Sequence, residues 1–383
     1  MRNLLPSFVA LLVLGACAAN EAEPEVAEAT AAATTAPSAE PAATAAAVVA
    51  PTPEELKKAE DAKKLQADFA KQTEEISKEK ARFTAELEAK VKALAETNNT
   101  DTAKALKALL ASDHRTPGDS ARDSWRHPVE TLTFFKLKPN QKVLEFGGGG
   151  GWYTELLAPL LSKNGKLSVT GADPNGPVTE RSTLYGQRMK SFIDKSPALG
   201  SKIDFVLVDP KKPNAGADAS YDLVIAMREL HGWQNRDVID HNMAEAFRVL
   251  KPGGFFGVEQ HRAKEDADVK ASSKNGYLPE KYVIERAVAA GFKLDAKSEI
   301  NANPKDTKDH SEGVWMLPPN LRAPEKDANK AGYDKAKYAA IGESDRMTLR
   351  FVKPKTAAKP AADKPGADKP AAKPAADKPA AKK

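Results

Sequence analysis

The chain has 383 residues, of which 41% are hydrophobic and 29% are charged. This length and apolar share suffice for one large or two ordinary globular domains and exclude a wholly disordered or collagen-like chain, while the single Cys excludes a fold held by internal disulfides. The formal net charge of +5 equals that of residues 354–383 alone, which contain eight Lys and three Asp, so the basic pI near 8.9 does not indicate nucleic-acid binding.

The first residues have the pattern of an export signal. A basic start, an apolar run from Leu4 to Leu14 and the small residues after it form a stretch too short to span a bilayer. Leu14-Gly15-Ala16-Cys17 resembles the lipobox of bacterial lipoproteins, which implies a signal peptide at 1–16 and lipidation of Cys17. With Ala18 next, the resemblance implies export and a lipid anchor in the outer membrane, on its periplasmic side. An ordinary cleaved signal with an incidental Cys is the alternative.

Two segments follow this signal. Residues 17–53 are almost all Ala, Glu, Thr and Pro and lack the apolar bulk that offsets the entropy of ordering, which predicts a disordered tether. Residues 54–112 are rich in Lys, Glu and Ala with apolar residues at helical spacing, which predicts a long charged helix with a break near 97–100. The heptads are few and imperfect, so a solvated or docking helix fits this segment better than a coiled coil.

Residues 113–353 are predicted to form the main domain, because short apolar strands alternate there with helical patterns. The predicted strands are Lys142–Phe146, Lys166–Gly171, Ile203–Val208, Asp222–Met227, Gly254–Glu259, Phe292–Ile300 and Met347–Val352. The predicted helices are Trp152–Leu161, Val178–Ile193, Val238–Leu250 and Pro279–Ala290. Such alternation requires a parallel sheet that helices cover on both faces.

A run of glycines joins the first predicted strand to its helix. Gly147, Gly149 and Gly151 allow a tight turn and let a ligand approach the backbone. The helix that follows offers free N–H groups at its start. Glu145, at the end of the strand, can accept hydrogen bonds from a cationic amine or a hydroxyl. Asp173 ends the second strand about twenty residues past the glycines, which suits a carboxylate that accepts hydrogen bonds from ribose hydroxyls.

Two classes of nucleotide cofactor are bound by this layout. The dinucleotide fingerprint Gly-x-Gly-x-x-Gly fails, because Trp152 or Tyr153 stands where its third glycine belongs. Glu-x-Gly-x-Gly-x-Gly fits instead and resembles the first motif of the class I S-adenosylmethionine-dependent methyltransferases. The resemblance continues at Asp209, at Tyr221–Ile225 and at Phe247–Gly254, in the order and spacing of that family.

This resemblance implies a fold, a cofactor and a set of binding residues. The implied fold is the Rossmann-like class I methyltransferase fold, an α/β fold whose mostly parallel seven-stranded sheet carries helices on both faces. The implied cofactor is S-adenosylmethionine. Its implied contacts are Glu145, Gly147, Gly149, Gly151, Asp173, Asp209 and Arg228.

Further segments are similar to a group of predicted bacterial methyltransferases, often exported, whose motifs do not settle the substrate. The segments are 121–132, 149–155, 228–233, 258–262, 301–306, 313–319 and 341–346.

Three histidines are candidate catalytic bases for methyl transfer. His231 follows the fourth strand, His261 follows the fifth, and His127 precedes the first. The ordinary pKa of His lies near neutrality, so each could deprotonate a hydroxyl or amine acceptor. A structural role is the equal alternative for each of them, and His127, which precedes a Pro, suits a turn cap. The histidines lack the paired spacing of zinc ligands, and the Gly-x-Ser-x-Gly pattern of a serine hydrolase is absent.

The leading hypothesis is therefore an exported, lipid-anchored methyltransferase that acts on a small-molecule substrate. S-adenosylmethionine is made in the cytoplasm, so an exported enzyme would need the cofactor to be delivered. The first alternative is a non-enzymatic envelope protein that retains the fold and binds another ligand. The second is an adaptor whose charged helix and tail contact anionic envelope surfaces, because the regular Pro of 354–383 predicts an extended cationic tail. Residues 301–345 are long for a connection and are a candidate substrate lid.

Overall fold

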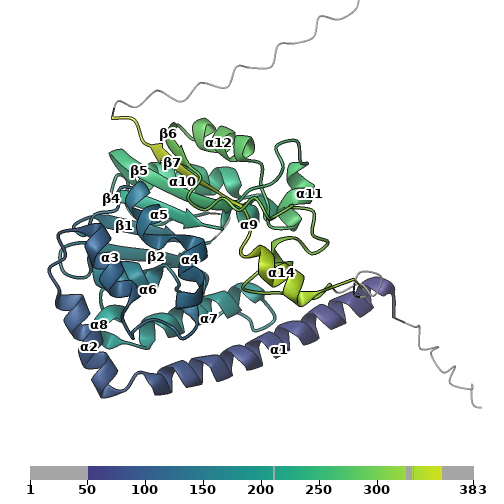
Figure 1. Cartoon of the computed structure of the whole chain (residues 1–383), viewed down its shortest axis with the longest axis horizontal. Coiled ribbons are helices and arrows are strands. Elements are labelled where there is room, and N and C mark those ends of the chain that lie inside the picture. Colours follow the sequence, from purple (N-terminus) through teal and green to yellow (C-terminus); the bar gives the residue numbers. More distant parts are fainter. Residues whose placement is uncertain (1–50, 210–211, 325–329, 331, 356–383) are drawn as a thin grey trace, which may run out of the picture. The chain divides into compact units, whose positions relative to one another are not determined.

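The computed structural model describes residues 51–209, 212–324, 330 and 332–355 (Figure 1). The predicted signal peptide, Cys17, nearly all of the tether and nearly all of the cationic tail lie outside these residues. Within them, no helix combines the length and the apolar character that a bilayer crossing requires.

The centre of the domain is a seven-stranded sheet in the order β3-β2-β1-β4-β5-β7-β6. The strands are β1 (Lys142–Phe146), β2 (Lys166–Gly171), β3 (Ile203–Leu207), β4 (Tyr221–Met227), β5 (Leu250–His261), β6 (Lys293–Ser298) and β7 (Arg346–Val352). All neighbouring strands are parallel except β7, which is antiparallel to β5 and to β6. This is the Rossmann-like class I methyltransferase fold, and the predicted mostly parallel seven-stranded sheet is confirmed.

The inner strands are apolar because helices cover them on both faces. Val143 and Leu144 are neighbours in β1 and both are fully buried, but they belong to two different hydrophobic clusters on opposite faces of the sheet. The edges are more open, since Leu207 on β3 is 53% exposed and Leu294 on β6 is 37% exposed. The sheet thus has a continuous core at its centre and solvated edges.

Helices pack on both faces of this sheet (Figure 1). The first cluster joins the sheet to α2 (Ala85–Glu96), α3 (Thr102–Leu110), α5 (Pro128–Phe134), α6 (Thr154–Leu161), α7 (Arg181–Asp194) and α8 (Pro197–Gly200). The second cluster includes α9 (Leu230–Asn235), α10 (Ile239–Val249) and α12 (Glu280–Ala289). The remaining described elements are α1 (Pro53–Arg82), η1 (Asp119–Arg122), α4 (Asp123–Arg126), α11 (Val269–Lys274), η2 (Gly313–Met316) and α14 (Lys335–Ile341).

The charged segment before the main domain forms three helices rather than one. The predicted break near 97–100 separates α2 from α3, and a second break lies before α2, where Thr84 Oγ1 accepts a hydrogen bond from Leu87 N at 3.3 Å. Leu87, Val91 and Leu106 are buried in the first cluster, against α6 and the sheet. Helices α2 and α3 therefore belong to the core of the main domain, which is predicted from the sequence to begin only at residue 113.

The long connection between β6 and β7 is held by buried polar contacts. Asp306 accepts hydrogen bonds from Tyr277 Oη at 3.0 Å and from the Asp345 N–H at 2.8 Å. Asn301 Nδ2 donates to Thr131 Oγ1 and to Thr348 Oγ1 at 2.9 and 3.0 Å. These contacts tie the two ends of the connection to the domain and bring residues 343–346 near α4.

Candidate active site

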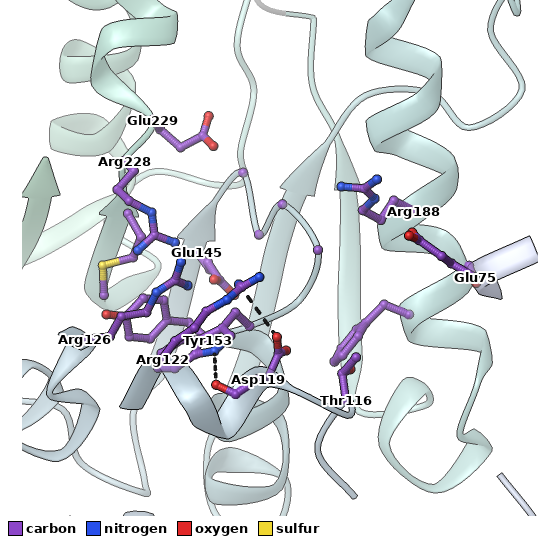
Figure 2. A pocket seen from close by; sticks show the side chains of 18 of the residues that line it. Glu75, Thr116, Asp119, Arg122, Arg126, Glu145, Tyr153, Arg188, Arg228 and Glu229 are labelled. Atoms are coloured by element: carbon purple, nitrogen blue, oxygen red, sulfur yellow. Dashed lines mark hydrogen bonds and ion pairs between the residues drawn. The ribbon is translucent and has the colours of Figure 1, made fainter. Parts of the chain in front are cut away.

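A cavity of about 500 Å³ lies beyond the carboxyl ends of β1, β4 and β5. The strand order reverses between β1 and β4, and open α/β sheets bind ligands in the crevice at such a switch point. The walls come from loop 147–150, the ends of β4 and β5, η1, α4, α7 and α1 (Figure 2). The cavity therefore lies where the sequence predicts the cofactor.

The glycine-rich loop forms the floor of the cavity. Gly147, Gly149 and Gly151 have φ angles of 61°, 57° and 89°, and the Gly147 N–H donates to Thr170 Oγ1 at 3.0 Å. A Cβ on Gly151 would lie 2.4 Å from the Phe192 ring, whereas a Cβ on Gly149 would meet nothing closer than 4.0 Å. Gly149 thus presents bare backbone to open space that a ligand can fill, and Gly151 packs behind the floor against α7.

Two carboxyl groups lie beside this floor. Glu145, at the end of β1, is 2% exposed and accepts a hydrogen bond from Thr154 Oγ1 at 2.7 Å. Glu229 comes shortly after the end of β4. Its carboxyl carbon lies 2.5 Å from the position that a Cβ on Gly147 would take. Burial raises the pKa of Glu145 and of Glu229 to about 7. A cationic ligand in the cavity would stabilise the ionised form of both acids.

We expect the affinity for the predicted cofactor, S-adenosylmethionine, to rise between about pH 6 and about pH 8. The raised pKa values mean that Glu145 and Glu229 bind protons in the free protein near pH 7, and a bound sulfonium favours their ionised forms. Binding then releases protons, so a higher pH strengthens it. Titration calorimetry over this range is the measurement, with Glu229→Gln expected to flatten the slope. An affinity that does not change with pH in the wild-type protein would contradict the assignment.

Arginines line the cavity wall on the side of β4 and α4. Arg122, at the end of η1, Arg126, at the end of α4, and Arg228, directly after β4, lie together on this wall (Figure 2). Arg126 is 4% exposed, and its Nε donates to both carboxylate oxygens of Glu343 at 3.1 Å. Burial first, and then the charges of Arg228 and Arg122, lower the pKa of Arg126 to about 10. The wall is therefore densely cationic.

Two of the three candidate histidines line the cavity and lie together. The ring centroids of His231 and His261 are 5.7 Å apart, Gln260 Nε2 lies 3.4 Å from His231 Nδ1, and His261 Nδ1 lies 2.5 Å from Ser344 Oγ. Burial lowers the pKa of His231 to about 4 and that of His261 well below its ordinary value. The near-neutral pKa expected of a catalytic base is therefore wrong for both, and both rings are neutral at pH 7.

The other predicted site residues lie outside the lining of this cavity. His127 has a φ of 40° between α4 and α5, and its Nδ1 lies 3.3 Å from Asn301 Oδ1, which is the turn position that its sequence context suits. Asp173 is exposed just past the end of β2, where its Oδ1 accepts from the Asn175 N–H at 2.8 Å. Asp209 is exposed past the end of β3. Both acids follow the strand ends that the sequence predicts, at the β2–β3 side of the cavity.

Helix α1 supplies a cavity wall that no pattern in the sequence predicts. Gln72, Glu75, Ile76 and Glu79 line the cavity, and their spacing places them on one helical face. Gln72 Nε2 donates to Leu184 O at 3.0 Å and its Oε1 accepts from Arg188 Nε at 3.1 Å, so Gln72 joins α1 to α7. Glu79 pairs with Lys195 at 2.8 Å. Only Leu65 and Gln72 are buried in this helix, so polar contacts hold most of it in place.

Gln72→Ala is expected to weaken the binding of S-adenosylhomocysteine, the demethylated product of the predicted cofactor, by roughly three- to tenfold. The reason is that it removes two hydrogen bonds that hold the α1 wall against α7. Titration calorimetry measures the change. Thr73→Ala is the matched control, since the Thr73 hydroxyl only bonds Phe69 O on the exposed face of the same helix. Equal affinities for the two variants would show that the α1 wall does not support binding.

Comparison with known proteins identifies a methyltransferase domain in part of the chain. Residues 144–258 match the family model described as a methyltransferase domain. A sterol 24-C-methyltransferase of Yarrowia lipolytica is 28% identical over 195 residues, which cover 48% of this chain and 45% of that protein. The hybrid PKS-NRPS synthetase mpsA of Macrophomina phaseolina is 30% identical over 120 residues, which cover 30% of this chain and 3% of that protein. The chain thus spans less than half the length of these curated relatives.

Among solved structures, a SAM-dependent methyltransferase from Aquifex aeolicus is similar, with 18% identity and a TM-score of 0.37 over 53% of this chain and 94% of that one. Residues 144–258 are therefore a methyltransferase domain on the class I fold, and S-adenosylmethionine is the cofactor of this domain. The open floor at Gly149 and the acids Glu145 and Glu229 fit a cationic nucleoside of this kind.

Proposed function

We propose that the protein transfers a methyl group from S-adenosylmethionine to a small-molecule acceptor in the bacterial envelope. The observation that carries this proposal is the bare, left-handed backbone of Gly149 facing open cavity space, with Glu145 and Glu229 beside it. When bound, S-adenosylmethionine supplies a methyl group on a sulfonium centre, which is electrophilic. The protein then has to hold the acceptor in line with that methyl group and keep water out.

The cofactor contacts follow from the positions of the chain's own residues. The loop backbone from Gly147 to Gly151 would hold the amino-acid end, and Glu145 and Glu229 would balance positive charge. Asp173 and Asp209, past the ends of β2 and β3, would contact the nucleoside end, Asp173 through the ribose hydroxyls. Asp173 and Asp209 would thus hold the nucleoside on the β2–β3 side, which leaves the ends of β4 and β5 for the acceptor.

The acceptor side contains a histidine with one nitrogen already engaged. Ser344 Oγ forms a hydrogen bond with His261 Nδ1. When Nδ1 is the donor of this bond, Nε2 is left to accept a hydrogen bond from the acceptor. The neutral ring at pH 7 can accept a proton that the acceptor loses, although its lowered pKa makes it a weaker base than an exposed His. His231 lies beside it and would orient the acceptor by a hydrogen bond. We propose no catalytic role for His127, which does not line the cavity.

Titration of the purified protein with S-adenosylmethionine and with S-adenosylhomocysteine tests the cofactor site, and transfer of a tritiated methyl group to a small-molecule extract tests the reaction. We expect micromolar binding that Asp173→Ala weakens, and labelled product only with active protein. Binding without transfer would favour the non-enzymatic envelope protein that binds a ligand in the same cavity. Failure to bind either nucleoside would overturn the enzyme assignment.

The envelope location is a separate part of the proposal. The lipobox-like Leu14–Cys17 supports export and a lipid anchor at Cys17, on the periplasmic side of the outer membrane. Labelling cells with radioactive palmitate should mark the wild-type protein and not Cys17→Ser. Equal labelling of the two would exclude this anchor.

The cationic tail is proposed to contact anionic envelope surfaces rather than nucleic acid. Its eight Lys and three Asp account for the net charge of the whole chain. Deleting 354–383 should abolish binding to vesicles of anionic lipid at low salt, since such attraction is electrostatic and screened by salt. Unchanged vesicle binding would rule out a role for the tail.

A further inference from the structure

The arginine wall carries hydrogen-bond donors that the protein itself does not use. Of the nitrogens of Arg126, Nε donates hydrogen bonds to Glu343. Among the residues that the structure describes, no hydrogen bond reaches Nη1 or Nη2 of Arg126, although the side chain is 5% exposed and lines the cavity. The two NH2 groups of this buried guanidinium can therefore donate hydrogen bonds to a ligand in the cavity.

Arg228 is the second arginine of this wall, and its side chain is 20% exposed. Its Nη1 lies 3.4 Å from Glu259 Oε2, which also accepts from Tyr153 Oη at 3.2 Å, and Arg346 Nε lies 2.8 Å from the other oxygen of Glu259. Three side chains therefore share the Glu259 carboxylate, and of these three contacts the one to Arg228 is the longest. The N–H of Arg228 donates to Glu259 O at 2.7 Å and holds the residue at a φ of 61°, a strained conformation that aims the side chain at the cavity.

Positive charge exceeds negative charge in this buried cluster. Arg126, Arg228 and Arg346 face two carboxylates, Glu259 and Glu343. The next cation, Arg122, already pairs with Asp119 at 3.7 Å. Glu145 and Glu229 also lie near Arg228, but they flank the glycine floor, where they would balance the positive charge of the cofactor. The cluster can therefore take one more anionic group without leaving a buried charge unpaired.

The wall also lies on the acceptor side of the site. Arg228 and Glu259 belong to the ends of β4 and β5, while Asp173 and Asp209, the proposed nucleoside contacts, follow β2 and β3 on the other side of β1. Arginine forks match the paired oxygens of a carboxylate or phosphate. We propose that the methyl acceptor is an anionic small molecule whose carboxylate or phosphate group is bound by Arg228 and Arg126. This inference rests on the proposed function and assigns Arg228 to the acceptor rather than to the cofactor.

The cofactor has a carboxylate of its own, so the test must separate two sources of the anion. The protein is first titrated with S-adenosylhomocysteine, which carries the carboxylate, and with 5′-methylthioadenosine, which lacks the amino-acid end. Failure of both to bind would end the proposed function itself. The protein saturated with S-adenosylhomocysteine is then titrated with inorganic phosphate, with benzoate, and with benzamide, the neutral analogue of benzoate.

We expect phosphate or benzoate, but not benzamide, to bind the loaded protein. Arg228→Gln should weaken that binding about ten- to a hundredfold, since a charge-assisted pair is lost, and Arg228→Lys should weaken it less because the charge remains. Arg286→Gln, which removes a positive charge from α12 at its pair with Asp240, should not change it. Thermal unfolding checks that each variant folds. If Arg228→Gln does not fold, the affinity of Arg228→Lys is compared with that of the wild-type protein instead.

Three results would overturn the inference while leaving the methyltransferase assignment intact. The first is loss of S-adenosylhomocysteine affinity in Arg228→Gln with unchanged 5′-methylthioadenosine affinity, because Arg228 would then bind the cofactor's carboxylate. The second is equal binding of benzoate and benzamide. The third is no binding of either phosphate or benzoate to the loaded protein at millimolar concentrations.

Discussion

Gly149→Ala is expected to weaken S-adenosylhomocysteine binding about ten- to a hundredfold, which corresponds to the ~1–3 kcal/mol that an extra methyl group costs in a filled site. The Gly149 Cβ would meet no protein atom closer than 4.0 Å, so the methyl group would stand in the space that the ligand occupies. Titration calorimetry measures the affinity, and urea unfolding measures the stability of the same sample.

Gly253→Ala separates this effect from backbone strain. Gly253 has a φ of 82°, but it lies near the amino end of β5, whereas the cavity lies beyond the carboxyl ends of the strands. A side chain at positive φ costs roughly 1–2 kcal/mol, so both variants should lose similar stability. Only Gly149→Ala should lose affinity. Equal affinities in the two variants would mean that the ligand does not approach the backbone at Gly149.

Arg346→Met is expected to lower the free energy of unfolding by about 3–5 kcal/mol, because it removes from two buried carboxylates, Glu259 and Glu343, the cation that they share. Arg346 is 1% exposed, its Nε lies 2.8 Å from Glu259 Oε1, it pairs with Glu343, and its Nη2 donates to Trp125 O. Burial alone would raise the pKa of Glu343, but the charges of Arg126 and Arg346 lower it to about 2. Urea unfolding followed by tryptophan fluorescence measures the loss.

Arg181→Met is the matched control for a solvated pair. Arg181 lies 2.9 Å from Asp68, and the two side chains are 46% and 39% exposed. Water screens such a pair, so its loss should cost no more than ~1 kcal/mol. If Arg346→Met were no more destabilising than Arg181→Met, the buried cluster would not hold the 343–346 segment against α4.

The central sheet is determined by local patterns in the chain. Each central strand, such as β1 at Lys142–Phe146, is a short apolar run between turn residues, and the glycines after it admit only a tight turn toward the next helix. These properties depend on neighbouring residues, so the order of the strands, the parallel sheet and the glycine loop follow from the sequence. The exact bounds do not, since the strand predicted at Gly254–Glu259 extends over Leu250–His261 in the structure. The last strand, predicted at Met347–Val352, begins one residue earlier in the structure, at Arg346.

The acceptor side depends on contacts between distant residues, which no local pattern contains. Arg126 and Glu343 are separated by 217 positions and meet only when β7 inserts between β5 and β6. Helix α1 is polar along nearly its whole length, so nothing local marks the face at Gln72 as a cavity wall. The pKa values of His231 and His261 likewise depend on burial, which packing alone sets.

The sequence by itself therefore determined the net charge of the tail, the fold and the cofactor loop, because composition and short-range periodicity encode them. Only the tertiary structure decided which charges are paired, which donors remain free and which histidines face the cavity. Each of those properties depends on all the residues that surround a side chain in space. The sequence alone is compatible with several pairings of the same charges, and only the folded sheet selects one of them.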